Sequence, residues 1–102
     1  MDELEKRLTF SVTKNNRTFT FRRPTAKQLI TADVLAAQLR GLVPVQALLY
    51  SVSLSDMVAS LSTYVTDPKP FDFSGLFEDE IAEIYNEVAK WLDTFRKPVA
   101  GQ

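Results

Sequence analysis

Residues 19–28 read FTFRRPTAKQ, and this stretch indicates where a β element ends and an α element begins. Its two phenylalanines alternate with threonine, as in a half-buried strand. Pro24 then ends strand pairing because it has no N–H to donate. Thr25 and Gln28 form a T-x-x-Q capping box, in which each side chain satisfies a backbone N–H at the start of a helix. The stretch therefore predicts a strand that ends at residue 22 and a helix over residues 25–41.

Residues 8–22 predict an antiparallel β-hairpin. Apolar and polar residues alternate on both sides of Asn15-Asn16. Asparagine tolerates positive φ better than most residues, which suits the centre of a tight hairpin turn. One face of the hairpin is apolar and consists of Leu8, Phe10, Val12, Phe19 and Phe21. Two strands alone are marginal in water, so we expect this face to pack on helices or on another sheet.

Two helical segments follow the hairpin. Helix 25–41 ends at Arg40 and Gly41, which suit a helix C-terminus. Its residues available for burial are Leu29, Ile30, Val34, Ala37 and Leu39. Residues 44–66 predict an apolar helical layer of one or two helices. Serine competes for backbone groups, so the serines of this layer favour a bend or a fresh start near residues 53–55.

A proline-rich loop over residues 66–73 precedes the last helix. Asp72 or Ser74 suits the N-cap of an acidic amphipathic helix over residues 74–97. Its apolar residues recur every three or four positions and keep to one face: Phe77, Ile81, Ile84, Val88, Trp91 and Phe95. We expect residues 98–102 to fray. Together these elements predict one domain over residues 1–102, of the α+β class and mostly α, with a two-stranded N-terminal hairpin followed by three to four packed helices.

The composition excludes several kinds of chemistry. Among the 102 residues there is no cysteine and no histidine, so disulfides, thiolate metal sites and Ser–His or Cys–His catalysis cannot form. The acids of the last helix lack a histidine partner for a metal site, and we interpret them as a solvated face: Glu78, Asp79, Glu80, Glu83 and Glu87. We therefore expect no enzyme and no catalytic, cofactor-binding or metal-binding residue. No apolar run approaches the roughly 20 residues of a membrane span, so we expect a soluble, cytoplasmic protein.

The net charge of −1 hides an asymmetry between the two parts of the chain. Residues 1–40 carry eight basic and four acidic side chains, whereas residues 41–102 carry four basic and nine acidic ones. This pattern predicts either solvated faces of different sign or docking of one part on another copy or on a charged partner. Arg22 and Arg23 have no glycine-rich loop beside them, and the negative net charge disfavours nucleic acid. We expect these two arginines to meet acids, such as those of the last helix.

Three aromatic residues bracket the proline-rich loop, and two interpretations of them stay open. Phe71 and Phe73 either pin the loop onto the core or, together with Tyr64, offer aromatic anchors to a protein partner. With Arg22 and Arg23, these three aromatics are the candidate partner-binding residues.

The stretch Phe21-Arg22-Arg23-Pro24-Thr25, with Leu29 after it and compatible elements over residues 8–96, resembles the tail assembly chaperones of bacteriophages. Members of this family often carry a strand that ends in a hydrophobic–Arg–x–Pro–Thr pattern and leads straight into a helix. The resemblance implies a non-enzymatic protein without cofactors, which binds the tape measure protein, keeps its long helices soluble and helps recruit tail tube subunits. It implies a place in the cytoplasm of the bacterial host and absence from the mature virion. Some families of this type also self-associate.

Two other functions fit the same sequence. One is a small structural or connector protein of the phage virion, which mass spectrometry of purified virions would separate from a chaperone. The other is a small nucleic-acid-binding regulator that uses the basic N-terminal part of the chain, and it predicts binding that weakens steeply with salt.

Overall fold

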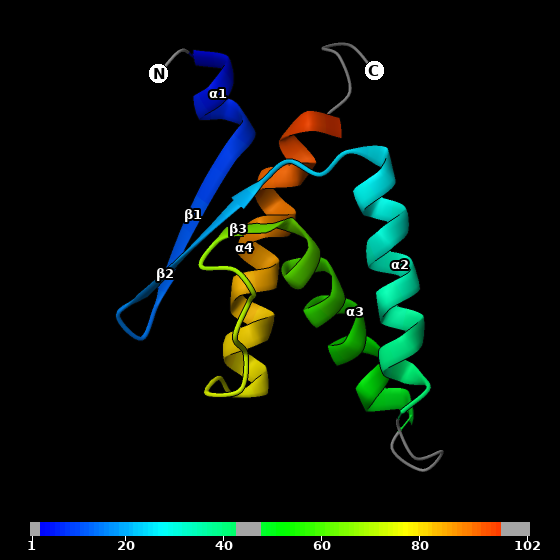
Figure 1. Ribbon diagram of the computed structural model, residues 1–102. Helices are drawn as coiled ribbons and strands as arrows, with labels where there is room; N and C mark the ends of the chain where they lie inside the picture. Colours follow the sequence, from blue (N-terminus) through cyan, green and yellow to red (C-terminus); the bar gives the residue numbers. More distant parts are fainter. Residues whose placement is uncertain (1–2, 43–47, 97–102) are drawn as a thin grey trace.

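The computed structural model describes residues 3–42 and 48–96, and over these residues the chain is an α+β protein that is mostly α. The elements, in chain order, are α1 (Glu3–Leu8), β1 (Thr9–Lys14), β2 (Arg17–Arg22), α2 (Ala26–Arg40), α3 (Leu48–Tyr64), β3 (Val65–Asp67) and α4 (Glu78–Arg96). The strands form one antiparallel sheet in the order β1-β2-β3. α4 packs on β1, and α3 packs on both α4 and α2, so that α2 lies farthest from the sheet (Figure 1). Both described ends of the chain lie at the same end of the molecule (Figure 1).

The predicted hairpin is confirmed, and so is its turn. Lys14 pairs with Arg17, and both residues between them have positive φ, 55° at Asn15 and 61° at Asn16. These angles give a turn whose twist matches that of the strands. Hydroxyl pairs across the outer face join Ser11 to Thr20 at 3.0 Å and Thr13 to Thr18 at 2.9 Å. The opposite face is apolar and turns towards the helices.

The sheet has a third strand that the sequence pattern does not predict. β3 pairs with β2, placing Val65 opposite Phe21 and Asp67 opposite Thr20. The hairpin is therefore not an isolated pair of strands, and the expected loop over residues 66–73 begins inside a strand. Three residues are too few to show an alternating pattern, and the spacing of apolar residues places Val65 in the preceding helical layer. Val65 is buried because it pairs with Phe21, a residue that is distant in the sequence.

Of the alternatives for the second helical segment, a fresh start near residues 53–55 is wrong, because α3 runs without interruption from Leu48 to Tyr64. Ser55 is buried inside this helix and does not divide it. α3 packs against α2, α4 and β2, and this packing outweighs the weak preference of serine for other conformations. A further difference is α1, a short helix that ends at Leu8, which we expected to be the first residue of the hairpin.

α4 begins at Glu78, four residues later than expected, and neither proposed N-cap lies next to it. Asp72 instead accepts hydrogen bonds from the Ser74 N–H at 3.1 Å and the Ser74 hydroxyl at 2.6 Å, which forms a turn within the loop. At the start of the helix the Phe77 N–H donates to Glu80 Oε1 at 2.8 Å, and this hydrogen bond replaces the backbone partner that the first turn lacks. Phe77 itself is 75% exposed, so the buried stripe of α4 begins at Ile81.

α2 starts as predicted but buries different residues. In its capping box the Thr25 N–H donates to Gln28 Oε1 at 2.9 Å, and the Gln28 N–H donates to Thr25 Oγ1 at 3.3 Å. The buried residues are Ala32 and Ala36, which are small enough to let α2 approach α3 closely. Of the set expected to be buried, Leu39 is half-buried against the core, whereas Leu29, Ile30, Val34 and Ala37 are exposed. α2 therefore presents much of its apolar surface to solvent.

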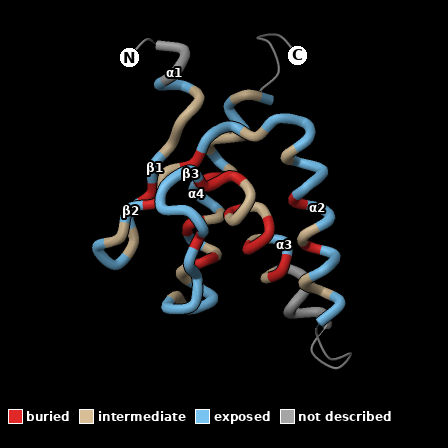
Figure 2. Tube along the Cα trace, viewed as in Figure 1, coloured by how far each residue is buried: buried red, intermediate tan, exposed pale blue. Residues whose placement is uncertain are grey.

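The core lies between the apolar face of the sheet and the two helices α3 and α4, where the buried residues gather (Figure 2). Its largest fully buried side chains are Phe19, Phe21, Leu61, Val65, Ile84 and Val88. At one end Phe10 stacks on Trp91 with ring centroids 5.3 Å apart, and at the other Phe19 meets Phe71 edge to face at 5.2 Å. Every strand of the sheet thus contributes residues to the core, whereas α2 contributes residues from only one side.

Candidate functional site

A groove runs between α2 and α4, with α3 at its base, and we call it the α2–α4 groove. It consists of three adjoining hollows of about 500, 380 and 90 Å³. The two larger hollows share Ser60 and Tyr64 of α3 and Tyr85 of α4, and the smallest adjoins both of them through Leu29, Leu92 and Arg96. The groove exists because the buried face of α2 packs mainly on α3 and leaves α4 at a distance.

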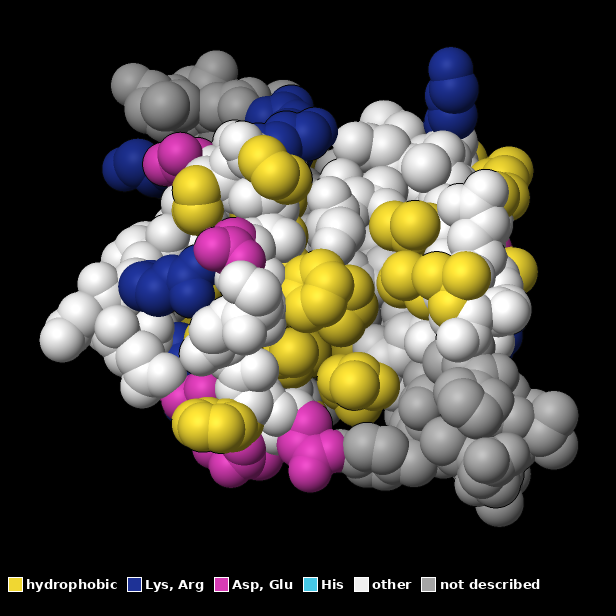
Figure 3. Space-filling model, turned by 60° about the horizontal axis from the view of Figure 1, so that its bottom comes forward, with side chains coloured by type: hydrophobic (Ala, Val, Ile, Leu, Met, Phe, Trp, Pro, Cys, Tyr) yellow, Lys and Arg dark blue, Asp and Glu magenta, His cyan; other side chains and the backbone are white. Residues whose placement is uncertain are grey.

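One wall of the α2–α4 groove comes from α2. Leu29, Ala32, Asp33 and Ala36 line it. Leu29 is exposed, and further apolar side chains of α2 lie beyond the wall, among them Ile30, which is 66% exposed. Figure 3 shows hydrophobic side chains gathered in two places on one face, in its middle and on the side where α2 lies. This part of the surface therefore offers apolar contacts that the fold itself does not use.

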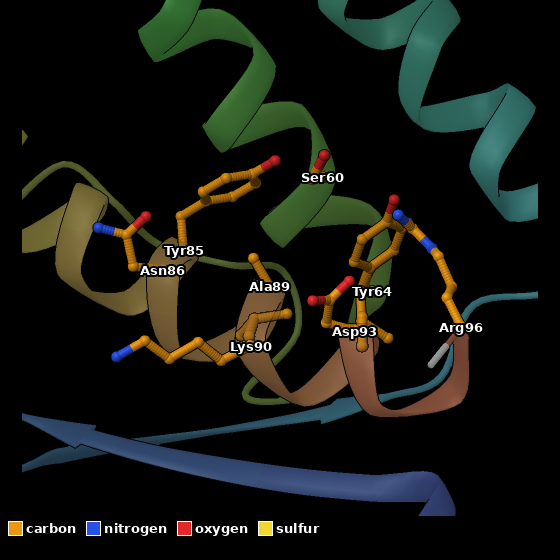
Figure 4. A pocket seen from close by; sticks show the side chains of 10 residues that line it. Ser60, Tyr64, Tyr85, Asn86, Ala89, Lys90, Asp93 and Arg96 are labelled. Carbon is orange, nitrogen blue, oxygen red and sulfur yellow. The ribbon is translucent and has the colours of Figure 1, made fainter. Parts of the chain in front are cut away.

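The opposite wall comes from α4 and is more polar. Asn86, Lys90, Asp93 and Arg96 line it together with Tyr85. In Figure 4 the Tyr85 hydroxyl points towards Ser60, and the side chain of Arg96 extends alongside the ring of Tyr64. Burial raises the pKa of the Tyr64 hydroxyl, and its hydrogen bond with Ser60 opposes this shift. The Tyr64 hydroxyl therefore acts as a neutral hydrogen-bonding group at neutral pH.

The structure separates the five predicted partner-binding residues. Tyr64 and Phe71 are buried in the core, and Phe71 does pin the loop onto it through its contact with Phe19. Phe73 is 41% exposed and stacks on Phe71, with ring centroids 6.2 Å apart. Both arginines are exposed at the end of β2, far along the chain from the aromatics. Two of the five residues line the α2–α4 groove: Tyr64 lines both larger hollows, and Arg23 lines the smallest hollow at one end.

The expected contact between Arg23 and the acids of the last helix takes a different form. The Arg23 guanidinium lies over the ring of Phe95 at 4.3 Å, in a cation–π contact near the end of α4. The acids in the first turns of α4 meet the opposite end of the hairpin. There Lys14 pairs with Glu83, and the Asn15 side-chain amide donates to Glu80. Antiparallel strands reverse direction at the turn, so the tip and not the end of the hairpin reaches the acidic part of α4.

Two hydrogen bonds hold the pKa of Glu80 below its ordinary value of 4.5. The larger effect comes from the Phe77 N–H and the smaller from the Asn15 side chain. A lowered pKa means that the folded state favours the carboxylate, which therefore stabilises the fold above pH 4.5 and stops doing so as the pH falls below that value. Glu80→Gln should lower the melting temperature at pH 7, and the difference from wild type should shrink as the pH falls below 4.5.

Thermal unfolding followed by circular dichroism across this pH range measures that difference. Glu78→Gln is the matched control, because it removes a carboxylate from the same turn of α4 without removing these two hydrogen bonds. A difference between wild type and Glu80→Gln that stays constant with pH would contradict the assignment.

Basic side chains of the N-terminal part are engaged within the molecule. Lys14 pairs with Glu83, and Arg40 Nη1 lies 2.6 Å from Asp56 Oδ1, so the two oppositely charged parts of the chain meet each other. Arg17 lies over Phe19 and donates to the Asp72 carbonyl at 2.9 Å, and Arg7 lies over Phe95. Such contacts leave fewer cations to form a surface for a polyanion.

Comparison of the chain with family models, with curated proteins and with solved structures finds no match. Within residues 3–42 and 48–96 no group of three acidic side chains is arranged to hold a metal ion. None of the helices in these ranges is long and apolar enough to cross a membrane.

The sequence does not reveal the α2–α4 groove in advance. Tyr85 and Ser60 stand beside the apolar stripes of their helices and carry no motif. One signal is present in α2, whose apolar residues occupy two sides of the helix: Ile30 and Val34 lie one turn apart on one side, whereas Ala32, Ala36 and Leu39 lie on another. Apolar residues on two sides indicate a helix that packs on two neighbours. In the structure one side packs on α3, and the other is exposed.

Proposed function

We propose that this chain is a non-enzymatic phage tail assembly chaperone whose α2–α4 groove binds a helical segment of the tape measure protein. One observation carries the proposal: three residues of the stretch on which the family resemblance depends, Arg23, Pro24 and Leu29, line one end of this groove. In this proposal the strand–proline–helix junction sets the position of α2 and thereby forms the client site.

The shape and chemistry of the groove suit a helical client. An amphipathic helix binds by placing its apolar side chains, three and four residues apart, in a groove between other helices. The exposed side chain of Leu29 supplies apolar contact on the α2 wall, and the α4 wall supplies hydrogen-bonding and charged groups along the rim. A client bound in this way would cover apolar surface that is exposed on α2, which is what keeping a long helical protein soluble requires. Recruitment of tail tube subunits would then use another surface of the chaperone–client complex.

The test is co-expression with the tape measure protein of the same genome, followed by measurement of its soluble fraction. Wild type should raise that fraction, and Leu29→Glu should weaken binding at least about tenfold by placing a charge in the apolar wall. Leu42→Glu is the matched control, because Leu42 is an exposed leucine just beyond α2 that lines none of the three hollows.

The two parts of the proposal fail separately. If the client is no more soluble with the wild-type protein than without it, the chaperone function is wrong. If wild type and Leu29→Glu protect the client equally, the function stands but the α2–α4 groove is not the client site. Mass spectrometry of purified virions should find no copy of this chain, whereas a connector protein would be present.

A further inference from the structure

The outer edge of β1 is open along part of its length. β2 is the central strand and β1 an edge strand, and no described strand pairs with the far side of β1. The Arg23 N–H donates to the Leu8 carbonyl at 2.8 Å, so Leu8 and Arg23 form a hydrogen-bonded pair, and such pairs recur at every second residue along the hairpin. The backbone N–H and C=O groups of Ser11 and Thr13 therefore point away from β2, towards the open edge.

A second groove lies beside this edge, on another side of α4 from the α2–α4 groove. It has a volume of about 500 Å³ and is lined by residues 11–14 of β1 together with Glu83 and Glu87 of α4. One side of it thus presents unpaired backbone groups and the other presents carboxylates. Glu83 pairs with Lys14, whereas Glu87, one helical turn farther on, forms no ion pair with any described residue.

We propose that this edge groove binds an extended peptide segment carrying a basic side chain, which adds a fourth strand to the sheet beside β1. The Ser11 and Thr13 backbone groups would supply the hydrogen bonds of the new ladder, as in other cases of strand addition. The Glu87 carboxylate would pair with the lysine or arginine of the segment. The site is separate from the groove proposed for the client helix and does not depend on that function.

The charges of the groove favour such a segment over a second copy of this chain. Pairing of β1 with β1 of another copy would extend the two sheets into one and bring both copies of α4 under it. Glu83 is compensated by Lys14 in each copy, but the two Glu87 carboxylates would then lie under the same joined sheet, and like charges oppose association. A basic segment from another protein meets these carboxylates with opposite charge.

The probe is a short synthetic peptide in which valine alternates with threonine and lysine, compared with a peptide in which glutamate replaces each lysine. Binding is followed by amide hydrogen exchange and chemical-shift changes in NMR spectra of the whole chain. The lysine peptide should slow exchange of the Ser11 and Thr13 amides at least about tenfold while leaving the amides of β2 unchanged. The glutamate peptide should bind more weakly.

Glu87→Gln should weaken binding of the lysine peptide by roughly three- to tenfold. Glu78→Gln removes the same charge from the same helix outside the groove and should leave the affinity unchanged. Ser11→Pro removes an outward-pointing N–H that β2 does not use, and it should abolish protection of Thr13.

Three results would overturn the proposal. The first is no binding of the lysine peptide up to about 1 mM. The second is equal binding of the lysine and glutamate peptides. The third is protection of the Ser11 and Thr13 amides without peptide that rises with protein concentration, because the edge would then be occupied by a second copy of this chain.

Discussion

Phe19→Ala is expected to lower the free energy of unfolding by about 3–5 kcal/mol, the usual cost of removing a large aromatic side chain from a core. Phe19 is 0% exposed and lies where the sheet meets the loop after β3. The substitution removes its edge-to-face contact with Phe71 and the support that its ring gives to the Arg17 guanidinium, 5.0 Å from the ring centroid. A domain of this size has a total stability of about 5–10 kcal/mol, so the variant should be only marginally folded.

Phe77→Ala is the matched control for this substitution. It deletes the same atoms, but Phe77 is 75% exposed, so its effect should stay within about 0.5 kcal/mol. Urea unfolding followed by circular dichroism gives the free energy of unfolding of both variants. The comparison requires that this free energy falls with urea concentration at the same slope in each. If both variants lost the same free energy of unfolding, the buried apolar stripe of α4 would extend to Phe77, as the residue spacing alone predicts.

Features that depend on a few neighbouring residues could be predicted from the sequence. The positive φ angles at Asn15 and Asn16 and the capping box of Thr25 and Gln28 are local, and both are present in the structure. The order of elements and the mostly helical α+β class follow from the same kind of signal. Local preference and tertiary packing agree at these positions, which is why reasoning from short segments succeeds there.

Features that depend on contacts between distant segments could not be predicted. β3 exists because Val65 meets Phe21, and three residues carry too little pattern to show this in advance. The choice between Ala36 and Ala37 as the buried residue of α2 depends on where α3 lies. The candidate site has the same limitation: the sequence indicates Tyr64 only by its position beside a loop, whereas its neighbours in the α2–α4 groove come from two other helices.

Ala36→Glu is expected to destabilise the protein by about 2–4 kcal/mol, because it places a charged side chain at a position that is 3% exposed. Ala36 lines the α2–α4 groove beside Asp33, so the new carboxylate would lie near another of the same sign. It would also prevent the close approach of α2 to α3 on which the groove depends.

Ala37→Glu makes the same chemical change one residue later, on the exposed side of α2, and it should alter stability by no more than about 0.5 kcal/mol. Helix propensity changes equally in the two variants, so the difference between them isolates the packing of α2 on α3. Urea unfolding measures that difference, and client binding provides a second measurement, because only Ala36→Glu should disrupt the α2–α4 groove. If Ala37→Glu proved the more harmful variant, α2 would pack through the face that the sequence pattern predicted, and the groove would have to be placed elsewhere.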